Sequence, residues 1–161
     1  MFSTTRENTR QGAQQKAYLH KQISQEKKRK GDQYTVFLIE DNIDDREQIL
    51  KTLEKSPYVY DVHCFECGDD LVAHFVNEGY YSSGSVRNMR LLILMDIHLP
   101  GVNGMEILRD LKEHPMTKDI PIIMITGDAS SERVEEARQL QVSGFILKPV
   151  QLDNIHDIIH R

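Results

Sequence analysis

Four short, uninterrupted apolar runs recur along the chain, and a polar residue follows each of them. The runs are VFLI, LLILM, IIMI and GFIL, which cover residues 36–39, 91–95, 122–125 and 144–147. Continuous rather than alternating apolar character is typical of parallel strands that are covered on both faces. A weaker strand is predicted around Tyr60 to Phe65. The sequence therefore favours an α/β fold.

The segments between these runs carry apolar residues at spacings of three and four, which is the period of a helix. The helical stripes are Ile49, Leu50 and Leu53; Leu71, Val72, Phe75 and Val76; Met105, Leu108 and Leu111; Val134, Ala137 and Leu140; and Leu152, Ile155 and Ile159. Five strands that alternate with five helices predict a (βα)5 three-layer sandwich around a parallel sheet. The pattern alone leaves the order of the strands open.

Polar residues cluster where the strands end. Glu40 and Asp41 follow the first strand, Asp96 the third, Thr126 the fourth and Lys148 the fifth. If the strand order is the flavodoxin-like 2-1-3-4-5, ligands bind beyond the carboxyl ends, at the switch between the first and third strands. Each residue alone has an ordinary explanation as a cap, a strand former or a surface charge. Their joint occurrence at successive strand ends predicts one shared pocket.

The residue types in this pocket predict Mg²⁺-dependent phosphoryl chemistry. Mg²⁺ prefers oxygen ligands and binds through one or two carboxylates plus phosphate, which suits Glu40, Asp41 and Asp96. A carboxylate can attack phosphorus to give an aspartyl phosphate, and Asp96 is the natural nucleophile. Lys148 and the Thr126 hydroxyl supply charge and donors to the phosphoryl oxygens, with main-chain N–H groups near Ile97 and Gly127.

Four blocks of the chain resemble those of two-component response-regulator receiver domains of the chemotaxis type. They are FLIEDNIDDRE, LILMDIHLPGVNGMEIL, IIMITGD and GFILKP, and the resemblance covers about residues 34 to 160. It implies the flavodoxin-like fold with strand order 2-1-3-4-5. It also implies that Glu40 and Asp41 are the acidic pair, with Glu a tolerated variant at position 40. Asp96 is then the phosphoacceptor, Thr126 the switch hydroxyl and Lys148 the family's lysine.

Further roles follow from the same resemblance. Phe145 is the aromatic residue that rotates inward when Thr126 moves toward the phosphate. The Lys148–Pro149 peptide bond is expected to be cis, a state that is accessible mainly before proline. The main-chain carbonyl of His98 is implied as a further Mg²⁺ ligand, and the side chains of His98 and Asp128 as modifiers of the phosphoryl lifetime.

The predicted function is a switch in which a sensor histidine kinase or a histidine phosphotransfer protein phosphorylates Asp96, and the modified domain changes its binding to a downstream target. Such a protein is no enzyme beyond its own phosphorylation and dephosphorylation. A phosphorylation-independent scaffold is the alternative. An aspartyl-phosphate phosphohydrolase is disfavoured because His98 occupies the position of that class's second carboxylate, two residues after the nucleophile.

Charge divides the chain into a basic N-terminal extension, residues 1–31, and an acidic receiver domain, residues 32–161, with net charges of +6 and −11. The extension is too polar to fold alone and is expected to be helical or disordered. A solvated tail, or an exposed helix that mediates self-association as a homodimer, is favoured over nucleic-acid binding, for which no motif is present. With no signal segment and no apolar run of membrane-spanning length, a cytoplasmic protein is expected.

The two cysteines, one long loop and the last helix carry weaker signals. Cys64 and Cys67 form a lone C-x-x-C, which we interpret as two ordinary cysteines because no second pair accompanies it. Residues 77–90 are predicted to be a long loop, in which Tyr80 and Tyr81 are candidates for a partner site. The last helix is expected to be short, and no output domain is expected after it within this sequence.

Overall fold

Five parallel strands form one sheet in the order β2-β1-β3-β4-β5. This computed structural model describes residues 33–79, 90–99, 104–130 and 132–161. The strands are β1 (Tyr34–Ile39), β2 (Val59–Phe65), β3 (Leu91–Asp96), β4 (Ile122–Thr126) and β5 (Gly144–Leu147). The five predicted strands and the flavodoxin-like order are therefore confirmed.

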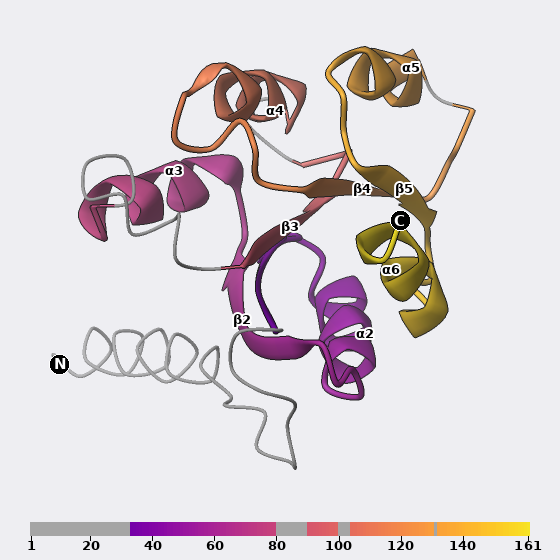
Figure 1. Cartoon of the computed structure of the whole chain (residues 1–161). Helices are drawn as coiled ribbons and strands as arrows, with labels where there is room; N and C mark the ends of the chain where they lie inside the picture. Colours follow the sequence, from indigo (N-terminus) through magenta and orange to yellow (C-terminus); the bar gives the residue numbers. More distant parts are fainter. Residues whose placement is uncertain (1–32, 80–89, 100–103, 131) are drawn as a thin grey trace, which may run out of the picture.

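Helices cover both faces of the sheet (Figure 1). They are α2 (Ile43–Leu53), α3 (Gly68–Asn77), α4 (Gly104–Glu113), α5 (Glu132–Gln139) and α6 (Leu152–Ile159). Helices α2 and α6 lie on one face, and α3, α4 and α5 lie on the other (Figure 1). The predicted (βα)5 three-layer sandwich is confirmed.

The apolar runs are continuous because both faces of each inner strand are buried. In β1, Phe37 and Ile39 pack toward α3, α4 and α5, whereas Val36 and Leu38 pack toward α2 and α6. All six residues of β3 are buried. Successive side chains of a strand point to opposite faces, so a strand between two helical layers needs apolar residues at every position.

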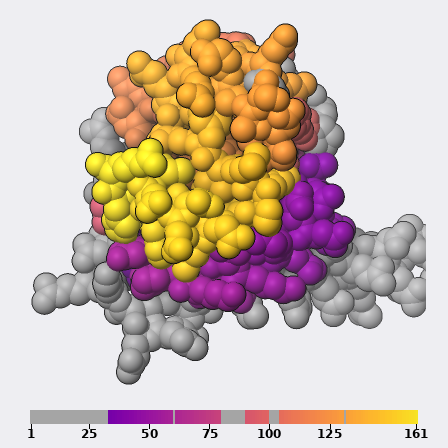
Figure 2. Space-filling view, turned by 90° about the vertical axis from the view of Figure 1, so that its right-hand side faces the viewer, coloured from indigo at the N-terminus to yellow at the C-terminus, as the bar shows by residue number. Residues whose placement is uncertain are grey.

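Helix α2 begins at a cap and is tied to the far end of the chain. The Asn42 side chain accepts a hydrogen bond from the Asp45 main-chain N–H at 3.0 Å, which satisfies one free donor of the first turn. The Gln48 side-chain amide donates to the carbonyl of Val150 at 2.9 Å. Figure 2 shows the purple segment that contains α2 beside the gold and yellow C-terminal segment. These contacts hold α2 beside the segment that connects β5 to α6.

Some members of the predicted helical stripes differ in the structure. Val76 is 59% exposed and Val72 is only half-buried, so the apolar core stripe of α3 consists of Leu71 and Phe75 rather than four residues. Leu140 lies one residue beyond the end of α5, although it still packs against the core. Helix α6 is short, with eight residues.

Some predictions fall on residues that the structure does not describe. The extension over residues 1–31 and the two loop tyrosines, Tyr80 and Tyr81, lie outside the described residues. Within the described part of the chain, no helix is long and apolar enough to cross a bilayer.

Candidate functional site: three carboxylates and a lysine at the end of the sheet

The fold brings the strand-end residues to one edge of the sheet. Glu40 follows the last residue of β1, Asp96 and Thr126 are the last residues of β3 and β4, and Lys148 follows β5. Because β3 lies between β1 and β4, Asp96 is one strand spacing, about 4.8 Å, from each neighbouring strand. Strand β5 is two spacings from β3, a distance that the long lysine side chain covers.

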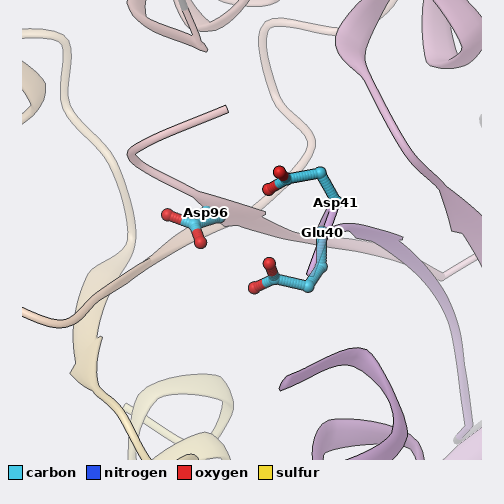
Figure 3. A group of neighbouring side chains, drawn as sticks. All are labelled: Glu40, Asp41 and Asp96. Atoms are coloured by element: carbon cyan, nitrogen blue, oxygen red, sulfur yellow. The ribbon is translucent and has the colours of Figure 1, made fainter. Parts of the chain in front are cut away.

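Three carboxylates converge at this edge. Glu40, Asp41 and Asp96 each place one carboxylate oxygen within 4.8 Å of the others. In Figure 3 the carboxylates of Glu40 and Asp41, which leave β1 one after the other, turn toward that of Asp96. Glu40 is fully buried and Asp96 is 5% exposed, whereas Asp41 faces solvent. The cluster therefore opens to solvent on the side of Asp41.

Lys148 places its ammonium among three carboxylates. Its Nζ lies 2.5 Å from Asp96 Oδ2, 2.7 Å from Asp45 Oδ2 and 2.8 Å from Glu40 Oε2. Burial acts to lower the pKa of Lys148, but its hydrogen bonds to Asp45 and Asp96 and its ion pair with Glu40 outweigh the effect of burial and raise the pKa above its ordinary value. The lysine is therefore charged at neutral pH. The Lys148–Pro149 peptide bond is cis.

Glu40 is the most constrained of the three carboxylates. Its Oε1 accepts a hydrogen bond from the Asn42 main-chain N–H at 3.0 Å. Its Oε2 is buried and lies close to Lys148, but no donor among the described residues points at it for a hydrogen bond. Burial raises the pKa of Glu40 and the charge of Asp96 adds to this, while Lys148 and Asn42 oppose it. A buried carboxylate oxygen with unused acceptor capacity, inside a carboxylate cluster, fits a divalent cation.

Asp96 is held by a main-chain donor as well as by Lys148. The N–H of His98 donates to Asp96 Oδ1 at 2.7 Å. The N–H of Ile97, which lies in the region where we expected a donor, instead binds the Ile125 carbonyl in the sheet at 2.9 Å. The His98 side chain is exposed. The two oxygens of Asp96 are thus positioned by the turn that follows β3 and by Lys148, which follows β5.

Thr126 makes its hydrogen bonds with Asp128. Its hydroxyl donates to the Asp128 carbonyl at 2.9 Å and accepts from the Asp128 N–H at 3.0 Å. The Asp128 carboxylate in turn accepts hydrogen bonds from the hydroxyl and main-chain N–H of Ser130, which lower its pKa. Phe145 is half-buried, with the Arg138 guanidinium 5.4 Å from its ring centroid.

Two residues at the start of α2 belong to the site although the sequence analysis did not select them. Asp45 binds Lys148 across 103 residues of sequence. Arg46 is 8% exposed and donates from Nη1 to the Glu40 carbonyl at 3.1 Å. The available signal was the acidic pair Asp44–Asp45, but acidic residues in a first helical turn are ordinarily explained by the helix dipole.

These contacts define a class of protein: an α/β domain with a carboxylate cluster, a lysine and a hydroxyl at the carboxyl edge of its sheet. Residues 36–160 match the family model described as "Response regulator receiver domain". The chain belongs to this family. Receiver domains are typically non-catalytic apart from their own phosphorylation.

Individual relatives agree with this assignment. The chain is 32% identical over 115 residues to the phosphate regulon transcriptional regulatory protein PhoB of Pseudomonas aeruginosa, covering 71% of this chain and 45% of that protein. It is similar to the bacteriophytochrome response regulator RtBRR, with 27% identity, a TM-score of 0.66 and coverage of 80% and 76% of the two chains. The phosphorylated cyanobacterial phytochrome response regulator RcpA gives 28% identity, a TM-score of 0.62 and coverage of 79% and 89%.

The extent of the match differs among the relatives. The chain spans about half the length of two curated relatives, 45% of PhoB and 58% of the two-component response regulator ARR15 of Arabidopsis thaliana, to which it is 26% identical over 121 residues.

Proposed function

We propose that this chain is a phosphorylation-dependent signalling switch in which Asp96 accepts a phosphoryl group from a sensor histidine kinase or a histidine phosphotransfer protein. The observation that carries the proposal is the setting of Asp96. One of its oxygens is bonded to Lys148 and the other to the His98 N–H, beside two further carboxylates. This arrangement places a nucleophile between a cation site and a fixed positive charge.

Mg²⁺ is the metal that this donor set fits. Glu40, Asp41 and Asp96 would hold it together with the main-chain carbonyl of His98, and the buried Oε2 of Glu40 is the acceptor that most needs such a partner. When bound, Mg²⁺ neutralises the charge that gathers on the phosphoryl oxygens.

The transfer step uses the remaining groups of the pocket. An Asp96 carboxylate oxygen forms a bond to phosphorus while the bond from phosphorus to the donor's leaving atom breaks and that atom keeps the electron pair. Lys148 exchanges its contact with Asp96 for one with a phosphoryl oxygen. The hydroxyl of Thr126 leaves Asp128 for another phosphoryl oxygen, and Phe145 moves inward behind it. His98 and Asp128, at the rim, modify the rate of hydrolysis.

The wider biological setting is part of the same proposal. Residues 32–161 form the receiver domain and residues 1–31 a basic extension. The domain acts in the cytoplasm, is an enzyme only toward its own phosphorylation and dephosphorylation, and passes the signal to a protein target. The extension is either a solvated tail or a helix that mediates self-association as a homodimer, in preference to a nucleic-acid-binding segment. Asp96 phosphorylation changes target binding because it adds charge and acceptor oxygens.

The test is the intact mass of wild type and of Asp96→Asn after incubation with acetyl phosphate, with and without Mg²⁺. We expect one phosphoryl group on wild type, only with metal, and none on the variant. Folded wild-type protein that gains no phosphoryl group, even with a trap for short-lived adducts, would favour the phosphorylation-independent scaffold. Repeated turnover of an external phosphomonoester would instead favour a phosphohydrolase.

A further inference from the structure

The ammonium of Lys148 has three hydrogens to donate, and the first turn of α2 takes one of them. Asp45 Oδ2 lies 2.7 Å from Nζ, and its side chain is 43% exposed, whereas Glu40 and Asp96 are almost completely buried. Asp45 is not among the carboxylates that cluster for a metal in the described part of the chain. Among the described residues, Asp45 is therefore the carboxylate partner of the Lys148 ammonium that does not belong to the carboxylate cluster of Glu40, Asp41 and Asp96.

Hydrogen bonds fix the first turn of α2, which carries Asp45. Its main-chain N–H binds the Asn42 side chain at 3.0 Å. The next residue, Arg46, is buried and donates to the Glu40 carbonyl at 3.1 Å. One turn further, Gln48 binds the Val150 carbonyl, two residues after Lys148. The start of α2 is thus fixed both to the end of β1 and to the segment that carries the lysine.

We propose that Asp45 is a positioning residue that holds the Lys148 ammonium in the pocket while Glu40 and Asp96 engage metal and phosphoryl group. This inference rests on the proposed function. Once those two carboxylates turn to other partners, Lys148 would be free to swing to solvent. The bond to Asp45 retains one N–H and directs the others toward the phosphoryl oxygens, which is the preorganisation that phosphoryl transfer requires.

General electrostatics makes the opposite prediction, so the proposal has a sharp test. Removing a negative charge beside a pocket that takes an anionic phosphodonor should speed phosphorylation if charge alone matters. Asp44 provides the matched control. It is the neighbouring acidic residue of the same first helical turn, it is exposed, and the ion pairs of Lys148 do not include it.

The experiment measures the rate of phosphorylation of the full chain against acetyl phosphate concentration, at Mg²⁺ levels that saturate each variant. We expect Asp45→Asn to lower the maximal rate about fivefold, the effect of a partly exposed charge pair, with the half-saturating concentration changed less than about twofold. We expect Asp44→Asn to react as fast as wild type or slightly faster. Asp45→Asn that is no slower than Asp44→Asn would overturn the proposal.

Two further measurements isolate the route through Lys148. In a Lys148→Met background, Asp45→Asn should cause no additional slowing, and a persisting fivefold loss would refute the positioning role. With saturating Mg²⁺, which engages Glu40 and Asp96, but without any phosphodonor, nuclear magnetic resonance should show faster hydrogen exchange of the Lys148 ammonium in Asp45→Asn than in Asp44→Asn. Unchanged exchange contradicts the proposal even if the wild type accepts phosphate. A wild type that accepts none, with the exchange difference present, would refute the proposed function alone.

Discussion

Replacing Lys148 by methionine is the perturbation that the site geometry predicts most clearly. The ammonium neutralises the negative charges of Glu40, Asp96 and Asp45, whose carboxylate oxygens lie 2.5–2.8 Å from Nζ. Two of these carboxylates, those of Glu40 and Asp96, are buried. Methionine keeps much of the side-chain length and its apolar contacts but removes the charge. The variant therefore leaves a group of carboxylates that repel one another with no cation among the described residues in contact with them.

The magnitude follows from the burial of the groups. Removing one partner of a fully buried ion pair costs about 3–5 kcal/mol. Lys148 is 19% exposed and Asp45 43% exposed, so solvent screens part of the interaction. We expect Lys148→Met to lower the free energy of unfolding of the metal-free protein by about 3 kcal/mol at pH 7, at the low end of that range. The loss should shrink at acid pH, where the carboxylates become protonated.

Mg²⁺ should reverse much of this loss. Lys148 competes with a cation for the same carboxylates, so the variant should bind Mg²⁺ more tightly than wild type. A tenfold gain in affinity adds about 1.4 kcal/mol of stability under saturating metal.

Urea unfolding at pH 7 and at pH 4, with and without Mg²⁺, measures these differences. Lys51→Met is the control, because the Lys51 side chain is 74% exposed and, among the described residues, its ion pair is with Glu47, at 3.9 Å. Lys51→Met should change the free energy of unfolding by less than about 0.5 kcal/mol. The reasoning is refuted if Lys148→Met is as stable as Lys51→Met, or if Mg²⁺ stabilises it less than wild type.

Three other changes should have defined outcomes. Burial raises the pKa of Glu40 above 4.5, so ionising this carboxyl lowers the stability of the folded protein as the pH rises. In urea unfolding, metal-free Glu40→Gln should therefore be more stable than metal-free wild type at pH 7 but not at pH 4. Gly68→Ala would bring a methyl group within 1.5 Å of the buried Ile107 side chain and should cost about 1–3 kcal/mol, whereas Gly127→Ala meets nothing within 4 Å and should not; calorimetry distinguishes them. Burial raises the pKa of Cys64 to about 11, so in a Cys67→Ser background its alkylation should stay slow at pH 8 and accelerate toward pH 11; rapid reaction at pH 8 would contradict this.

The inner strands β1, β3 and β4 were predictable because burial on both faces requires a continuous apolar sequence, whereas β5 carries the apolar run GFIL at the edge of the sheet with only Ile146 buried. The run LLILM became β3, and the structure extends this strand to include Asp96 itself. Strand β2 was a weaker prediction because its sequence, VYDVHCF, mixes polar residues into the strand at the edge of the sheet. The order of the strands depended on family resemblance, since apolar patterns carry no information on which strands are neighbours.

The site was predictable where it is built from strand ends and unpredictable where it depends on how a helix lies against the sheet. Asp96 and Thr126 occupy strand termini, so topology alone brings them together. Asp45 reaches Lys148 only because α2 is docked against the segment after β5, a contact that spans about a hundred residues. Arg46 is buried where α2 meets the end of β1 and donates there to the Glu40 carbonyl, although arginine is mostly exposed in proteins.

The hydrogen-bond partner of the Thr126 hydroxyl could not be predicted from the sequence either. Threonine after a buried run indicates a strand end, but which oxygen its hydroxyl selects depends on the turn that follows. Here Asp128 and Ser130 close that turn and place the Asp128 main chain against the hydroxyl.

The central claim is that Asp96 is the carboxylate that accepts phosphate. In the most direct measurement, the protein is phosphorylated with acetyl phosphate and Mg²⁺, and borohydride then reduces the acyl phosphate to an alcohol. Peptide mass spectrometry locates the residue that was reduced. The account predicts reduction at Asp96 alone, and none without Mg²⁺. Reduction at a neighbouring carboxylate such as Asp41 or Asp45, with Asp96 unmodified, would contradict it.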